Sequence, residues 1–265
     1  MQHGLIKEFH SFTTASLKAL IMSKLYRALF TLYSWMLFVL LWIVSTLTAL
    51  VLSLDTQEKE KVFNTVERFF SRIAFNLMGM KVSIEGIENI PKNEPVIFIS
   101  NHQSMMDIKL SLAYIPVNFS FISKDTVFHV PILGAYMRAS GHIPIQREDD
   151  RKSYTTLLSA IKKLTARKSL VVFPEGTRSE DGQLGAFKRG ISLIILKSNR
   201  RVVPMAIHGS NQFMPKRGWL SHPEKRTVKI SFGKPLSFDS SKTDREYTIQ
   251  ITNQLRNEVS ELLNN

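Results

Sequence analysis

A long stretch without a single charged residue, from Ala28 to Leu54, constrains the fold more than any other feature of the sequence. An α-helix needs about 20 apolar residues to cross the ~30 Å hydrocarbon core of a bilayer, and this stretch is longer than that. A secretory signal peptide is disfavoured, because its charged leader would be too long and no small-residue cleavage site follows. We therefore expect residues 1–80 to form a membrane-associated helical element.

The charges that flank this stretch do not decide how it sits in the membrane. Cations within reach of the positive-inside rule occur equally on both sides. They are Lys7, Lys18, Lys24 and Arg27 before it and Lys59, Lys61, Arg68 and Arg72 after it. A simple span and a helical hairpin that dips into one leaflet both remain open. The apolar stripe at helical spacing from Val62 to Leu77 fits an interfacial helix or a packed core helix equally well.

After Gly79 the pattern changes to short β-branched runs that alternate with helical stretches. The expected strands are 81–84, 96–100, 120–122, 142–145, 169–173, 202–207 and 227–232. The expected helices are 105–114, 153–167, 187–197 and 244–263. This alternation predicts an α/β fold, with a mostly parallel sheet flanked by helices, for residues 81–265.

The composition excludes several kinds of covalent link, nucleophile and metal site. The chain has a formal net charge of +13 and no cysteine, which excludes disulfides, thiol nucleophiles and cysteine-ligated metal sites. Such a charge favours an anionic partner, namely a membrane surface, a phosphorylated substrate or nucleic acid. The basic stretch 197–229 fits any of these, but the sequence has no nucleic-acid recognition module. The sequence motifs of serine hydrolases, phosphate loops, Rossmann dehydrogenases and zincins are also missing.

One candidate for catalysis follows the expected strand that ends at Ser100. His102 and Asp107 suit a general base and the carboxylate that orients it, provided that the histidine precedes a helix and the aspartate lies in its first turn. Ser104 is a credible N-cap, which would make Asp107 the third helical residue. The same spacing also fits a capping box in which Asp107 only caps the helix. Both interpretations remain open from this motif alone.

Three further segments lie at or beside expected strands. They are Phe173–Ser179 (F-P-E-G-T-R-S), Gly141–Arg147 and the proline-interrupted strand Val202–Ile207. The guanidinium groups of Arg178 and Arg147 suit phosphate oxygens. Ends of parallel strands meet at one sheet edge, so we expect His102 and both arginines to converge there. Together they indicate an anionic substrate with a hydroxyl group to be deprotonated.

These four ordered blocks resemble those of the glycerolipid acyltransferase family, and within it the bacterial 1-acylglycerol-3-phosphate acyltransferases. The resemblance covers roughly residues 80–210, with its motifs in 96–210. It implies an α/β acyltransferase domain, an N-terminal two-helix membrane element, and a place on the cytoplasmic side of the inner membrane. The implied reaction moves an acyl group from acyl-CoA or acyl carrier protein to the sn-2 hydroxyl of lysophosphatidate, giving phosphatidate, without metal or cofactor. The chain departs from the family at Gln146, where members often carry an acid.

The resemblance also implies a role for individual residues. His102 would be the general base and Asp107 its orienting partner. The remaining candidates would bind or shape the site for the acceptor phosphate: Arg147, Arg178, Glu175, Gly176, Thr177, Lys124 and Lys188. Two other functions stay open. One is the same chemistry on another lysolipid or on glycerol 3-phosphate, and the other is a basic, non-catalytic membrane-surface protein.

Overall fold

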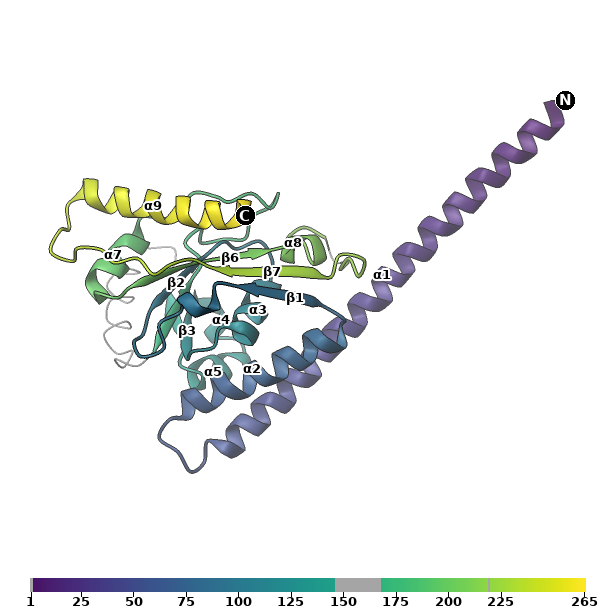
Figure 1. Cartoon of the computed structure of the whole chain (residues 1–265). Helices are drawn as coiled ribbons and strands as arrows, with labels where there is room; N and C mark the ends of the chain where they lie inside the picture. Colours follow the sequence, from purple (N-terminus) through teal and green to yellow (C-terminus); the bar gives the residue numbers. More distant parts are fainter. Residues whose placement is uncertain (1, 146–167, 219) are drawn as a thin grey trace.

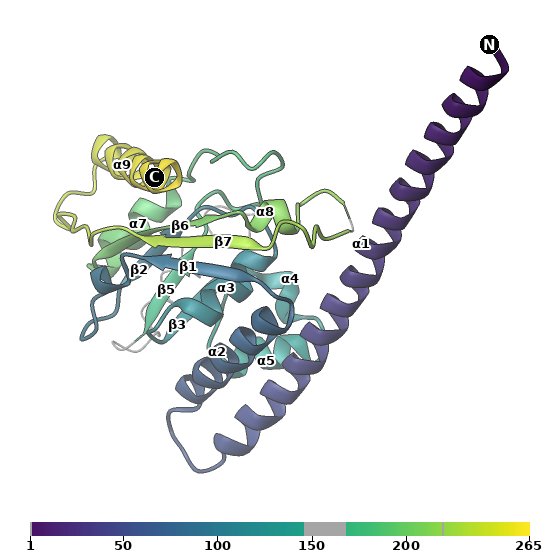
Figure 2. The same cartoon turned by 45° about the vertical axis from the view of Figure 1, so that its right-hand side comes forward.

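The chain begins with two helices that pack against each other. The computed structural model describes residues 2–145, 168–218 and 220–265. Helix α1 (Gln2–Leu52) and helix α2 (Lys59–Leu77) lie side by side, and the N-terminal part of α1 projects away from the rest of the molecule (Figures 1 and 2). Residues 28–52 thus form part of one continuous helix, and the hairpin is made by α1 together with α2.

The two faces of α1 differ in character. Small and hydroxyl side chains on one face are buried against the rest of the fold: Thr31, Ser34, Ser45 and Ala49, with Ser53 also buried just after the helix. Large apolar side chains on the other face are exposed, including Trp35, Met36, Leu40 and Leu47. The hydroxyl groups of Ser34, Ser45 and Ser53, within the uncharged stretch, therefore face protein. Within the described residues, Ser16–Leu52 is the one helix long and apolar enough to cross a membrane.

The apolar stripe of α2 serves both roles that the sequence left open. Val66 is buried with Phe63 and Phe75 in the core. Phe69 and Leu77, in contrast, are 60% and 56% exposed. One part of α2 therefore packs against the domain while another presents apolar side chains outward, as α1 does.

In the described part of the chain, seven strands form the sheet, and all seven were predicted from the sequence. They are β1 (Lys81–Glu85), β2 (Ile97–Ser100), β3 (Phe119–Lys124), β4 (Ile143–Ile145), β5 (Ser169–Val172), β6 (Val202–His208) and β7 (Thr227–Phe232). Their order across the sheet is β1-β7-β6-β2-β5-β3-β4. Neighbouring strands are parallel except β6 and β7. The carboxyl ends of β2, β5, β3 and β4 therefore lie along one edge, as an α/β fold requires of its ligand site.

The remaining helices among the described residues cover the sheet and its edges. They are α3 (Met106–Tyr114), α4 (Asp125–Phe128), α5 (Leu133–Ala139), α7 (Gly190–Ser198), α8 (Ser210–Phe213) and α9 (Arg245–Asn264), with the short 3₁₀ helix η1 (Ile87–Asn89). Helix α7 begins three residues later than expected, because the backbone N–H of Lys188 donates to Pro174 O (2.9 Å) and holds that residue in the loop after β5. The expected helix 153–167 lies outside the described residues.

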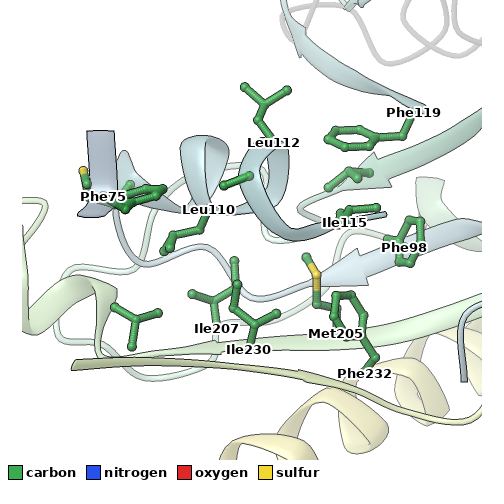
Figure 3. Packing of buried hydrophobic residues seen from close by; sticks show 14 of the residues in the cluster. Phe75, Phe98, Leu110, Leu112, Ile115, Phe119, Met205, Ile207, Ile230 and Phe232 are labelled. Carbon is green, nitrogen blue, oxygen red and sulfur yellow. The ribbon is translucent and has the colours of Figure 1, made fainter. Parts of the chain in front are cut away.

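Alternate side chains of the central strands pack into two separate cores. On β2, Phe98 faces the core shared with α2 and α3, whereas Ile97 and Ile99 face the core shared with α7 and α9. Figure 3 shows Phe98 with Phe232 and Met205 in the first of these cores. Because both faces of the sheet are covered, the polar groups that could form a site lie where the strands end.

His142, immediately before β4, gives a testable dependence of stability on pH. Burial, helped by the nearby Lys168 ammonium and opposed by the Glu67 carboxylate, lowers the pKa of His142 from 6.5 to about 3. A depressed histidine pKa contributes stability that is present above pH 6.5 and is lost as the pH falls toward 3. We expect the free energy of unfolding to fall by about 1.4 kcal/mol per pH unit through this group.

Denaturant unfolding of wild type and His142→Gln at several values between pH 7 and pH 4.5 measures this effect. The free energy of unfolding should depend less steeply on pH in the variant, by about 1.4 kcal/mol per pH unit. His129→Gln, which changes an exposed histidine, should keep the wild-type slope. Equal slopes for wild type and His142→Gln would contradict the assignment.

Candidate active site

The turn between β2 and α3 brings His102 and Asp107 together. Asp107 is fully buried, and its Oδ2 accepts hydrogen bonds from His102 Nδ1 (2.9 Å), Gln103 N (2.7 Å) and Ser104 N (2.8 Å). Helix α3 begins at Met106, so Asp107 is its second residue and not the third. The same carboxylate oxygen orients the imidazole and receives backbone N–H groups ahead of the helix. The geometry that each interpretation of this motif requires is therefore present in one side chain.

The imidazole of His102 is held in a fixed orientation. Its ring stacks on Phe173 with a centroid separation of 4.2 Å, and its side chain is only 15% exposed. Because Asp107 accepts the hydrogen on Nδ1, the neutral ring has its lone pair on Nε2. Within the described residues, Nε2 makes no hydrogen bond. That nitrogen is the one suited to take a proton from an alcohol.

Glu175 connects the loop after β5 to the turn that carries His102. Its Oε1 accepts from His102 N (2.8 Å) and its Oε2 from Gly185 N (2.9 Å). Burial raises the pKa of Glu175, and these two backbone bonds oppose that rise. The structure thus engages both carboxylate oxygens of Glu175 with protein N–H groups, so Glu175 braces the backbone that carries the histidine.

The loop that follows Glu175 is shaped by a glycine. Gly176 has a φ of +73°, and a Cβ at this position would lie 2.7 Å from Lys188 Cε. Any larger residue would therefore be strained and would displace Lys188. The loop borders a hollow of about 310 Å³, whose lining includes Thr177, Arg178 and Ser179. Among the described residues that line this hollow, Arg178 is the one cation, and Glu175 and Asp181 supply carboxylates.

Not all predicted site residues can be placed together. Lys124 is the last residue of β3 and is exposed at the same carboxyl edge of the sheet. Arg147 follows β4 but lies outside the described residues, as does Gln146. The structure joins His102, Asp107 and Glu175 by direct hydrogen bonds. Arg178 lies in the loop that follows Glu175. The residue after it, Ser179, donates its backbone N–H to His102 O (2.7 Å).

Several residues that support the site had no assigned role in the sequence analysis. Phe173 is the first residue of the F-P-E-G-T-R-S block, and its stacking on His102 could be seen only in three dimensions. Asn101 bridges β2 to β6, since its Nδ2 donates to Ile207 O (2.9 Å) and its Oδ1 accepts from Ile207 N (2.8 Å). A polar residue beside the histidine is the only signal that the sequence offered for this brace.

Comparisons with known proteins agree with this geometry. A family model described as "Acyltransferase" matches residues 81–208. A chloroplastic 1-acyl-sn-glycerol-3-phosphate acyltransferase of Arabidopsis thaliana is 36% identical over 184 residues, covering 68% of this chain and 49% of the relative. A second, from Brassica napus, is 32% identical and covers 83% of this chain and 64% of the relative. The chain thus spans about half to two thirds of the length of these curated relatives.

A solved structure is also similar. The crystal structure of the 1-acyl-sn-glycerophosphate acyltransferase PlsC from Thermotoga maritima superposes with a TM-score of 0.76 at 27% sequence identity. The match covers 91% of this chain and 97% of that protein. The similarity therefore extends beyond the motif region into the helices that precede and follow it.

Proposed function

Because this chain belongs to the acyltransferase family, we propose that it transfers a fatty acyl group from a thioester donor to the sn-2 hydroxyl of 1-acylglycerol 3-phosphate, producing phosphatidate. The observation that carries this proposal is the 2.9 Å contact between His102 Nδ1 and the buried Asp107 Oδ2, which leaves Nε2 as the basic nitrogen. The activity named for both plant relatives and for the Thermotoga protein supports the choice of acceptor.

The reaction follows from general base catalysis. His102 Nε2 takes the proton of the acceptor hydroxyl as its oxygen attacks the thioester carbon, and Asp107 stabilises the resulting imidazolium. The tetrahedral intermediate collapses with loss of the thiolate, which receives the proton from His102. The new ester is therefore formed in one transfer, without an acyl-enzyme. As proposed, the steps use only side chains of this chain, so neither metal nor cofactor takes part.

Cationic side chains would bind the acceptor phosphate. We assign this role to Arg178 beside the 310 Å³ hollow, to Arg147, and to the exposed Lys124 and Lys188. Thr177 and Gly176 would shape the loop that faces the phosphate. An arginine is suited to this task because its planar fork of donors matches phosphate oxygens.

The Arg178→Met variant tests the phosphate site. A hydrogen bond to a charged group contributes about 1.5–3 kcal/mol, so the KM for lysophosphatidate should rise about 10- to 100-fold. The KM for the acyl donor should change little. Arg201→Met is a suitable control, because Arg201 immediately precedes β6, at the opposite edge of the sheet, and pairs with Glu94. An unchanged acceptor KM in Arg178→Met would contradict the assignment.

The helical hairpin would hold the enzyme at its lipid substrate. We propose that residues 1–80 anchor residues 81–265 to the cytoplasmic side of the inner membrane. The exposed apolar face of α1 and the outward side chains of α2 support membrane binding. Acyl-CoA and acyl carrier protein, both cytoplasmic thioesters, would then reach the site from the aqueous side.

A transfer assay with the full chain in lipid tests the whole proposal. Labelled acyl-CoA and acyl carrier protein serve as donors, and lysophosphatidate, glycerol 3-phosphate and other lysolipids as acceptors. We expect phosphatidate from lysophosphatidate. Transfer to another acceptor only would retain the chemistry and change the substrate. No thioester turnover with any acceptor would overturn the proposal and favour a basic, non-catalytic membrane-surface protein.

A further inference from the structure

A segment outside the four sequence blocks crosses from α1 to the active site. We call residues 214–218 and 220–222 the strap; they lie between α8 and β7. At its start, Ser104 Oγ donates to Met214 O (2.7 Å), next to the catalytic turn. Near its end, the buried Ser221 donates its backbone N–H to Thr31 Oγ1 of α1 (2.9 Å). The strap is therefore fixed at both ends to other parts of the fold.

Lys216, in the middle of the strap, reaches the loop that carries Arg178. Its Nζ donates to the backbone oxygen of Arg178 (2.7 Å) and lies 3.4 Å from Thr177 Oγ1 and 3.5 Å from Glu180 Oε1. The Lys216 side chain is only 22% exposed. A partly buried ammonium bonded to a carbonyl oxygen is a stronger and more directional contact than a solvated surface pair.

This contact has a specific consequence because of the peptide bond involved. The carbonyl of Arg178 and the N–H of Ser179 belong to one planar unit. The N–H donates to His102 O (2.7 Å) while the carbonyl accepts from Lys216. Both ends of this plane are thus held, and the ammonium polarises the amide so that its N–H becomes a better donor to His102. The plane sets the position of Arg178 relative to the general base.

We propose that Lys216 is a positioning residue that fixes Arg178 at the correct place relative to His102. It acts through the Arg178–Ser179 peptide and does not itself touch the substrate. This inference rests on the proposed function of Arg178 in binding the acceptor phosphate. The residue is one of many cations in the basic stretch 197–229, and only its contact with the loop distinguishes it from a solvated lysine.

Kinetics of Lys216→Met, Lys216→Arg and Arg217→Met test the proposal in the full chain. Lys216→Met should raise the KM for lysophosphatidate about tenfold, or ~1.4 kcal/mol, and leave kcat and the donor KM within about twofold. Lys216→Arg keeps a donor and should recover most of the affinity. Arg217→Met is the matched control, because the neighbouring Arg217 is 78% exposed and pairs only with Glu180 within the described residues. An acceptor KM unchanged in Lys216→Met would overturn the inference.

Hydrogen exchange without substrate separates this inference from the proposed function. In Lys216→Met, the Ser179 amide should exchange about tenfold faster than in wild type, whereas the amides of β2 and β5 should exchange at the wild-type rate. In Arg217→Met, the Ser179 amide should also exchange at the wild-type rate. If wild type forms no phosphatidate but Ser179 shows this change, the structural role of Lys216 holds and the proposed function fails. If Ser179 exchange is unchanged, or every amide of the domain exchanges faster, the positioning role is overturned whatever the activity.

Discussion

Replacing His102 by alanine should lower kcat for acyl transfer by about 10²–10⁴-fold, the usual contribution of a general base. The acceptor hydroxyl then has no group positioned to take its proton. The KM for lysophosphatidate should change little, because the proposed phosphate contacts come from other residues. Single-turnover transfer of labelled acyl groups to lysophosphatidate in lipid vesicles measures the effect.

The fold should survive this substitution, which separates lost chemistry from lost structure. The backbone N–H of His102 still donates to Glu175, and the ring occupies a partly exposed position above Phe173. The unfolding temperature should therefore fall by only a few degrees. His129→Ala, at an exposed histidine, should keep full activity. Activity of His102→Ala within a few-fold of wild type would exclude the mechanism.

The second large effect is expected for Asp107→Asn, with a loss in kcat of about 10²–10⁴-fold. The amide oxygen can still accept from the backbone N–H groups of Gln103 and Ser104, so the start of α3 is preserved. His102, however, loses the negative charge that stabilises its protonated ring.

Comparison with Asp107→Ala isolates the charge from the capping role. Alanine leaves two buried backbone N–H groups without an acceptor, at a cost of about 1–3 kcal/mol each in the free energy of unfolding. Asp107→Asn should therefore be nearly as stable as wild type and almost inactive, whereas Asp107→Ala should be both inactive and less stable. Asp239→Asn, an exposed aspartate near α9, should match wild type in both assays. Near-normal kcat in Asp107→Asn would contradict an electrostatic role.

Local sequence patterns were sufficient to predict all seven strands. The central strands are short apolar runs whose burial demands pairing on both sides, as in β2, where all four residues are buried. Such runs can be recognised without knowledge of their neighbours. The same holds for the length of the apolar N-terminal stretch. The division of α1 into a packed face and an exposed face could not be predicted, because it depends on where α2 and the domain lie.

The order of polar residues after the strands also predicted much of the site. His102 and Asp107 are close in sequence, so their contact depends only on one turn and the start of a helix. Parallel strands bring their ends to a common edge, which placed Arg178 near them. Contacts between residues far apart in sequence, such as Asn101 with Ile207, needed the observed strand order β6-β2-β5.

The sequence by itself thus determined the α/β class, the long apolar N-terminal stretch and the residue types of the candidate site, since these follow from periodicity and from short-range spacing. Only the tertiary structure decided which groups hold them in place. Glu175 braces the His102 backbone, Phe173 supports its ring, and Lys216 bonds to the Arg178 carbonyl. The physical reason is that hydrogen bonds and ring stacking act over a few ångströms. Such contacts exist only once distant segments have been brought together by folding.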